Sequence, residues 1–273
     1  MSEFYVHDID PIAFSILDIP VPWYWLVYCC GFFLVYLGVE RLRRQSSPQV
    51  FTRNDLIDVM VSGWVGLIVG GRLFYIFAYY PGYYLRNPSA MFALWEGGMS
   101  FHGGLIGGFL AMCFMAYRKK QSVFHYADRI SLYVPVVLFF GRLANFANGE
   151  LVGRPTDVPW AVIFSRTYDA VPRHPSQIYE AIGEGLVLFL FLYLQRAKLL
   201  LPGFLSAQLI LGYGVIRFII EFYRSPDVQI GYLLLGLTMG HVLCAFMILV
   251  GGLLLVFRKQ VNLKLTYSNN PRQ

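Results

Sequence analysis

The chain has 273 residues, of which 57% are hydrophobic and 14% are charged, and its mean hydropathy is +0.54. These values lie far from those of soluble globular proteins and exclude an ordinary soluble domain. The net charge of +6 matters mainly through its distribution along the chain, because basic residues set the orientation of membrane proteins.

Seven apolar runs have about the length needed to span a bilayer core, roughly 20 residues. They cover residues 22–39, 57–80, 101–117, 131–147, 178–195, 203–222 and 236–257. We therefore predict an all-α, polytopic integral membrane protein with about seven transmembrane helices. No internal repeat, low-complexity tract or long linker divides the sequence, so we expect one transmembrane domain over residues 1–273.

Basic residues predict the orientation of these spans. The segments ERLRRQ (40–45), RKK (118–120) and RKQ (258–260) follow the first, third and seventh spans, and Arg196 and Lys198 follow the fifth. All lie on one side, which the positive-inside rule makes cytoplasmic. The N-terminus is then outside, the C-terminus is cytoplasmic, and residues 148–175 form an extracytoplasmic loop region. The first span lacks a basic n-region and a cleavage site, so we do not expect a cleaved signal peptide.

Eight arginines fall on the predicted outer side or in the outer halves of spans, where no lysine occurs. They are Arg72, Arg86, Arg142, Arg154, Arg166, Arg173, Arg217 and Arg224. A guanidinium group holds phosphate or carboxylate through paired hydrogen bonds, which an ammonium group does not. The pattern favours recognition of an anion, although helix ends or structural ion pairs explain Arg86 and Arg166.

The third span begins within EGGMSFHGG (96–104), which contains His102. Free N–H groups and the positive end of the helix dipole disfavour an imidazolium there, so we expect a neutral ring able to accept a proton. The alternative is a hydrogen-bonded structural histidine. Gly97 and Gly98 permit unusual backbone angles, and the glycines at 103, 104, 107 and 108 form two small-xxx-small pairs for helix packing.

The fourth span ends in FFGRLANFANGELVGRPTD (139–157), where Arg142 and Asn145 share a helix face. An arginine inside a membrane costs roughly 2.5–3.5 kcal/mol even on permissive scales, so a functional role is the default interpretation. The alternative is a structural ion pair with a carboxylate on another span. The helix ends near Glu150, and Gly153 lies in the turn that follows.

The fifth and sixth spans carry further polar residues. The segment RHPSQIYEA (173–181) reads as mainly architectural, with Ser176 as a helix cap. In GYGVIRFIIEFYRSPD (212–227), Arg217, Glu221 and Arg224 fall on one helical stripe. Such a stripe cannot face lipid, so we predict a polar interior cavity.

Cysteines and glycines give no sign of a metal or nucleotide site. The four cysteines lie in apolar runs without metal-ligand spacing, and no glycine-rich nucleotide loop is present. We therefore expect no metal, no cofactor and no nucleic-acid partner.

Taken in order, GGMSFHGG, GRLANFANGELVGRP, RHPSQIYEA and RFIIEFYRSPD resemble the motifs of the bacterial prolipoprotein diacylglyceryl transferases, together with WYWLVY near the first span. The resemblance covers nearly the whole chain. It implies a catalytic domain that transfers the diacylglyceryl group of phosphatidylglycerol to the lipobox cysteine of prolipoproteins. The products are a thioether and glycerol phosphate, in the first step of lipoprotein maturation. The implied location is the bacterial inner membrane, with a small extracytoplasmic head and an active site toward that side.

The resemblance also implies roles for individual residues. It assigns catalysis to His102, Arg142, Arg217 and Tyr24. It assigns substrate binding to Asn145, Glu150, Gly153, Glu221 and Arg224. Our hypothesis is that Arg142 and Arg217 clamp the phosphate while His102 assists deprotonation of the thiol. Two departures from the family pattern are Trp25, where a glycine is usual, and a short segment between Pro155 and Arg173.

Two other functions are compatible with arginines inside a membrane. A transporter for an anionic solute predicts inverted repeats or paired broken helices, and the sequence has no clear repeat. A different phospholipid transferase or phosphatase predicts an aspartate-rich metal motif or a Lys/Arg–His signature, and neither is present.

Overall fold

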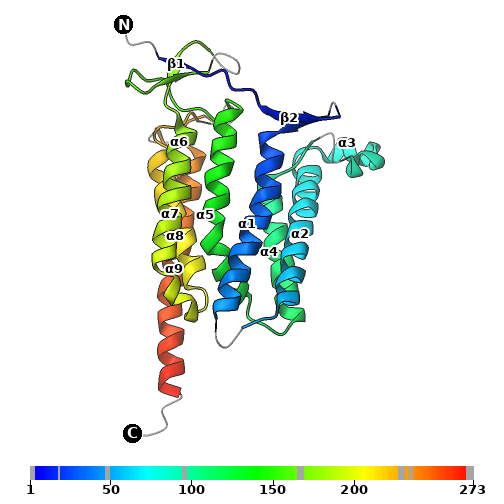
Figure 1. The fold of residues 1–273 in the computed structure, drawn as a ribbon, viewed down its shortest axis with the longest axis vertical. Coiled ribbons are helices and arrows are strands. Elements are labelled where there is room, and N and C mark those ends of the chain that lie inside the picture. Colours follow the sequence, from blue (N-terminus) through cyan, green and yellow to red (C-terminus); the bar gives the residue numbers. More distant parts are fainter. Residues whose placement is uncertain are drawn as a thin grey trace. The chain divides into compact units, whose positions relative to one another are not determined.

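The computed structural model describes residues 4–17, 19–46, 50–93, 97–164, 169–226, 231–233 and 236–268 (Figure 1). Within these ranges, seven helical segments follow the seven predicted apolar runs. They are α1 (Trp23–Gln45), α2 (Arg53–Tyr79), α4 (Phe101–Arg118), α5 (Val123–Ala147), the continuous segment α6 (Ser176–Glu180), η3 (Ala181–Val187) and α7 (Leu188–Leu194), α8 (Phe204–Ile220) and α9 (Met239–Ser268). In the described part of the chain, three short helical segments lie outside the runs, namely α3 (Pro81–Arg86), η1 (Pro88–Phe92) and η4 (Arg196–Leu200).

Five of the described helical segments are long and apolar enough to cross a membrane: α1, α2, α5, residues 176–194 and residues 239–257. Two more apolar helices, Gly103–Arg118 and Phe204–Ile220, are shorter. Large apolar side chains such as Phe77 and Leu194 are 68% and 79% exposed on these helices, as expected of surfaces that face lipid. The helical membrane protein is confirmed, whereas the count of seven spans and their orientation stay predictions.

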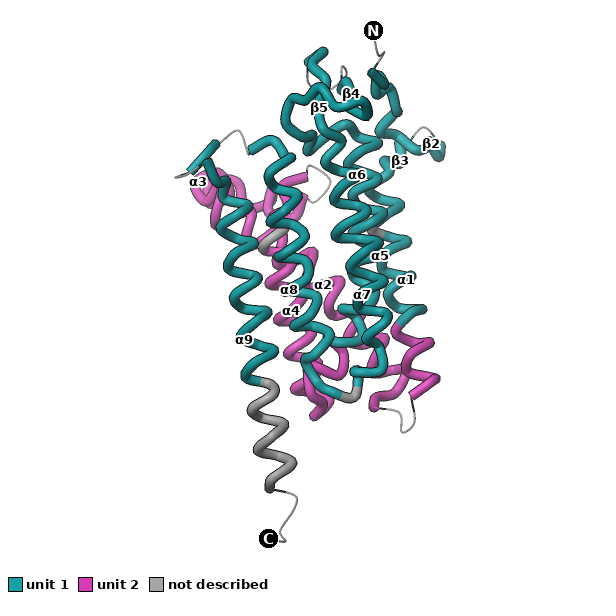
Figure 2. The backbone as a smooth tube through the Cα atoms, turned by 90° about the vertical axis from the view of Figure 1, so that its left-hand side faces the viewer, with its two compact units in different colours: residues 1–38, 128–273 teal, residues 39–127 magenta. Residues whose placement is uncertain are grey.

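The chain forms two compact units (Figure 2). Unit 1 comprises residues 1–38 and 128–273, and unit 2 comprises residues 39–127. The single catalytic domain over residues 1–273 stays a prediction.

In unit 2, glycines bring α2 and α4 into backbone contact. A Cβ atom at Gly107 would overlap the carbonyl oxygen of Gly66, and a Cβ atom at Gly70 would overlap that of Gly103. The packing role predicted for the glycines of the third span is therefore confirmed at Gly103 and Gly107. Their partner is a second small-xxx-small pair on α2.

Arg72 organises the loop that precedes α4. Its side chain is buried and directs all five N–H groups to backbone carbonyls, those of Ala90, Met91, Ala93, Gly97 and Gly98. Gly97 and Gly98 have φ angles of +80° and +78°, and a Cβ atom at Gly98 would lie 2.8 Å from Arg72 Nη1. The glycine pair before His102 thus allows the loop to fold around Arg72, which keeps no N–H group for an anion.

Unit 1 carries two small sheets that the all-α prediction did not include. Strand β1 (Tyr5–Val6) pairs in parallel with β4 (Val162–Ile163), which pairs antiparallel with β5 (Pro172–Arg173). A separate hairpin joins β2 (Ile12–Ile16) and β3 (Ile19–Pro22). Val152, Val162 and Phe164 form a small core under the first sheet, and Phe146 at the end of α5 packs against it. We call β1, β4, β5 and residues 148–164 and 169–175 the head (Figure 1).

The close packing of α2 and α4 gives a test of unit 2. We expect Gly107→Ala to lower the thermal unfolding midpoint in detergent, because overpacking costs about 1–3 kcal/mol and exceeds the gain of about 1 kcal/mol in helix propensity. Gly63→Ala on α2 is the control, since its Cβ atom would meet nothing within 4 Å. Equal midpoints for the two variants would contradict the close contact.

Candidate functional site

Six charged side chains of unit 1 form one buried cluster. They come from α5, from α6 and η3, and from α8 with the turn that follows it. Its members, called the charged cluster below, are Arg142, Glu180, Glu184, Arg217, Glu221 and Arg224. The side chains of Glu180 and Glu184 are 0% exposed, and those of the three arginines are 10–15% exposed.

Glu180 is the centre of this cluster. Its Oε2 lies 3.0 Å from Arg142 Nη1, while its Oε1 contacts Arg217 Nη1 and lies 3.4 Å from Arg224 Nη1. Glu184 accepts from both Nη2 and Nε of Arg142, at 2.9 and 3.1 Å. Glu221 pairs with Arg217 Nη2 at 2.7 Å. Three guanidinium groups and three carboxylates therefore balance one another in a setting where an unpaired charge would be costly.

A π-helical stretch positions Glu180 and Glu184. The α6 helix passes into a π-helical stretch, η3, so that Glu180 and Glu184 flank its start. Two glycines bring this stretch against its neighbours. A Cβ atom at Gly183 would lie 2.7 Å from Ile216 Cγ2 on α8, and one at Gly185 would lie 2.5 Å from Phe139 Cβ on α5. π-Helical turns are frequent at functional sites.

The interpretation of RHPSQIYEA as mainly architectural stays a prediction, and the structure adds that its Glu180 is the most connected member of the cluster. Glu184 was not predicted at all. The sequence did hold a signal, since two acids four residues apart in an apolar span share a helix face and need partners there. The structural alternative for Arg142 was an ion pair with a carboxylate on another helix. This ion pair is present, since Arg142 pairs with Glu180 and Glu184.

The carboxylate of Glu221 is held by residues at the start of α9 and by Thr238, which immediately precedes that helix. Thr238 Oγ1 donates to Glu221 Oε1 at 2.7 Å and lies 3.0 Å from His241 Nδ1. The Glu221 carboxylate packs so closely on Gly240 that a Cβ atom there would overlap it. Thr238 and His241 were not predicted, because the pattern at the start of the last apolar run resembles an ordinary helix N-terminus.

Three predicted residues form a second polar group. Tyr24 Oη donates to Glu150 Oε1, and Asn145 Nδ2 donates to Tyr24 Oη and, at 3.0 Å, to Glu150 Oε1. We call Tyr24, Asn145 and Glu150 the Tyr–Asn–Glu group. Asn145 lies one turn from Arg142 on α5, which places this group beside the charged cluster. Trp25 is 57% exposed, so the departure from glycine does not prevent Tyr24 from reaching Glu150.

Gly153 lies where three backbone segments cross. Its N–H donates to His174 O at 3.0 Å, and its carbonyl accepts from Ser225 Oγ at 2.8 Å. A Cβ atom at Gly153 would lie 2.6 Å from His174 Cβ and 2.7 Å from Tyr223 O. This crossing ties the head to the turn that carries Arg224, so the structure gives Gly153 an architectural role, and its role in substrate binding stays a prediction.

Four of the other outer arginines make no ion pair with the carboxylates of the cluster among the contacts of the described residues. Arg72 holds its loop, Arg154 Nε donates to the carbonyl of Arg224 at 2.9 Å, and Arg173 pairs with Asp169 at 2.7 Å. Arg86 is exposed at the end of α3. Arg166 lies outside the described residues.

His102 is the second residue of α4, whose N-terminus is capped by the Ser100 side chain accepting from the Gly103 N–H. Its expected place at the start of the third helix is therefore confirmed. Its side chain lies outside the part of the chain that the structure describes, and its role as a base stays a prediction. The polar interior is present as the two groups above, and a cavity within it also stays a prediction.

The acidic side chains of the cluster pair with guanidinium groups rather than with one another. Among the described residues, no three His, Cys, Asp or Glu side chains are placed to hold a metal ion. The carboxylates face guanidinium groups, and the same forked donors match the oxygens of a phosphate.

The chain matches the family model described as prolipoprotein diacylglyceryl transferase over residues 11–257. It is 47% identical over 250 residues to the phosphatidylglycerol–prolipoprotein diacylglyceryl transferase of Bordetella parapertussis, covering 91% of this chain and 95% of that protein. Proteins of the same name from Methylococcus capsulatus and a Wolbachia strain are 46% and 43% identical, over 90% and 94% of this chain and 94% and 97% of theirs.

The central position of Glu180 predicts a large effect of neutralising it. We expect Glu180→Gln to lower the thermal unfolding midpoint strongly, because breaking a buried ion pair by removing one partner costs about 3–5 kcal/mol. Asp169→Asn, which removes one partner of an exposed ion pair, is the control and should leave the midpoint unchanged. Equal stability of the two variants would show that Glu180 does not hold the arginines.

Proposed function

The chain belongs to the prolipoprotein diacylglyceryl transferase family, and we propose that its charged cluster holds the phosphate of phosphatidylglycerol while the diacylglyceryl group moves to a prolipoprotein cysteine. The enzyme thereby carries out the first step of lipoprotein maturation. The observation that carries this proposal is the placement of Arg142, Arg217 and Arg224 around Glu180, at the ends of the apolar helices of unit 1 and in the turn after α8.

The reaction needs such a group of arginines. The thiol loses a proton, its sulfur forms a bond to the glycerol carbon that bears the phosphate, and the carbon–oxygen bond breaks. Glycerol phosphate leaves with the bonding electrons, so negative charge grows on its oxygens. Guanidinium groups fixed around those oxygens stabilise the transition state more than the ground state.

The Tyr–Asn–Glu group suits the other end of the same substrate. The glycerol headgroup of phosphatidylglycerol carries hydroxyls that donate to a carboxylate and accept from an amide. Glu150 supplies the carboxylate, and Asn145 and Tyr24 fix its orientation through the hydrogen bonds described above. The proposed arrangement puts the headgroup at this group and the phosphate at the neighbouring cluster.

The positive-inside pattern supports an orientation for the enzyme. The end of α5, the start of α6 and the head carry no lysine, whereas Arg196 and Lys198 lie at the opposite end of the segment 176–194. The active site then faces the extracytoplasmic side of the inner membrane, where exported prolipoproteins present their lipobox cysteine.

Mass spectrometry of a lipobox peptide incubated with the purified protein and phosphatidylglycerol tests the function. The proposal requires a diacylglyceryl mass on the cysteine peptide and none on the same peptide with serine. Arg142→Ala should abolish the addition. A folded wild-type protein that adds no mass under these conditions would contradict the proposal.

The fork geometry of Arg142 gives a second prediction. We expect Arg142→Lys to lose nearly as much activity as Arg142→Ala, about 10²–10³-fold in kcat, because an ammonium does not replace paired hydrogen bonds. Arg86→Lys, at an exposed helix end, should retain wild-type kinetics. Full activity of Arg142→Lys would reduce the role of Arg142 to a simple charge.

The proposed base gives a third prediction. We expect His102→Gln to lower kcat by about 10²–10⁴-fold, the usual contribution of a positioned base. His125→Gln, the same substitution near the start of α5, should leave kcat unchanged. A His102→Gln enzyme within a few-fold of wild type would remove the base role and leave the family assignment intact.

A further inference from the structure

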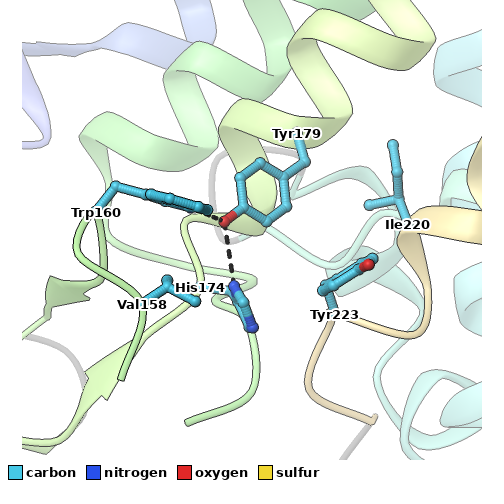
Figure 3. Close-up of a pocket in the computed structure, with 6 residues that line it drawn as sticks. All are labelled: Val158, Trp160, His174, Tyr179, Ile220 and Tyr223. Atoms are coloured by element: carbon cyan, nitrogen blue, oxygen red, sulfur yellow. Dashed lines mark hydrogen bonds between the residues drawn. The ribbon is translucent and has the colours of Figure 1, made fainter. Parts of the chain in front are cut away.

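An aromatic pocket opens between the head and the ends of two helices of unit 1. It has a volume of about 420 Å³, and Figure 3 shows the residues that line it. They are Val158, Trp160, His174, Tyr179, Ile220 and Tyr223. Trp160 and Tyr223 are 61% and 45% exposed, so aromatic surface is open to a ligand. No residue to which the family resemblance assigns a role belongs to this lining.

Hydrogen bonds fix the polar side of the pocket. Trp160 Nε1 donates to Tyr179 Oη at 2.7 Å, and Tyr179 Oη lies 3.1 Å from His174 Nδ1 (Figure 3). An indole N–H only donates, so Tyr179 Oη accepts from Trp160; we assign the tyrosine proton to His174 Nδ1, and this assignment leaves the ring proton of His174 on Nε2. Partial burial lowers the pKa of His174 and so favours this neutral ring. Nε2 lies on the side of the ring away from Tyr179 (Figure 3) and is a donor for a ligand.

The pocket lies next to the charged cluster along the chain. Tyr179, Ile220 and Tyr223 each immediately precede a member of that cluster in the sequence. Neighbouring Cα atoms are 3.8 Å apart, and an extended chain advances by about 3.3–3.6 Å per residue. A peptide residue in the pocket is therefore within a few residues of a group that reacts at the cluster.

The chemistry of the lining distinguishes a peptide from a lipid chain. Apolar walls with one directed N–H suit an apolar side chain beside a backbone carbonyl. Four of the six lining residues lie outside the apolar helices, at Val158, Trp160, His174 and Tyr223, whereas acyl chains lie along the helices. The hydrocarbon of an acyl chain also offers no acceptor to the imidazole N–H.

We propose that the aromatic pocket binds an apolar side chain of the prolipoprotein, a few residues from the reacting cysteine, while His174 Nε2 donates to a backbone carbonyl of the same segment. This inference rests on the proposed function and adds the element that selects the acceptor. The charged cluster selects the lipid, and the aromatic pocket selects the peptide.

Peptide selectivity tests the pocket. Two cysteine peptides that differ only in one residue near the cysteine, leucine or alanine, are compared by kcat/KM in wild type and in Trp160→Ala. We expect the wild type to prefer the leucine peptide at least about tenfold, as an apolar pocket does for a larger side chain. The variant should lose most of this preference, with an unchanged KM for phosphatidylglycerol. Tyr5→Ala is the control, because Tyr5 is an exposed aromatic residue of the head outside the pocket.

Val158→Trp provides a second variant that fills the pocket instead of opening it. This variant should lower kcat/KM for the leucine peptide more than for the alanine peptide, and its thermal unfolding midpoint should be unchanged. A Trp160→Ala enzyme that keeps the leucine preference overturns the pocket proposal. A Trp160→Ala substitution that raises only the KM for phosphatidylglycerol also overturns the proposal, because it would assign the pocket to an acyl chain. If the wild type modifies neither peptide, the proposed function itself fails, and the two failures are thus distinguished.

Discussion

The architecture of unit 1 depends on the ion pairs that hold Arg142 and Arg217 together. Two guanidinium groups repel each other, and inside an apolar bundle water does little to screen that repulsion. They remain neighbours because Glu180 contacts both, while Glu184 pairs with Arg142 and Glu221 pairs with Arg217. The π-helical stretch, the glycines that let it approach α5 and α8, and the contacts of Glu221 with Thr238 and Gly240 all serve to place these carboxylates.

In the proposed function, catalysis depends on the same balance of charge, with the arginines as donors to the phosphate. A carboxylate and a phosphate present similar pairs of oxygens to a guanidinium fork, so donors positioned by glutamates are already oriented for a phosphate ester. The protein positions these donors in advance, and little reorganisation is needed when charge develops on the leaving group. The Tyr–Asn–Glu group extends this polar surface by one helical turn along α5, which matches a substrate whose hydroxyl-bearing headgroup adjoins its phosphate.

The sequence predicted the helices well, because apolar runs of membrane length leave few alternatives. It also identified Arg142, Arg217 and Glu221, since charges in such runs require partners, while the resemblance brought in Tyr24 and Glu150. The strands of the head escaped prediction because two-residue strands carry no periodic signal. The pairing of Glu180 with the arginines was not predicted because its segment has the features of a helix start, and the carbonyl contacts of Arg72 depend on loop geometry that no local pattern encodes.

Retention of lipid by the purified enzyme tests most directly whether the paired arginines bind phosphatidylglycerol. Native mass spectrometry from mixed micelles of phosphatidylglycerol and phosphatidylcholine would compare wild type, the double variant Arg142→Gln/Arg217→Gln and the exposed control Arg86→Gln. If the paired arginines bind phosphatidylglycerol, wild type and control retain it selectively and the double variant, still folded, does not. Equal selective retention by all three proteins would contradict it.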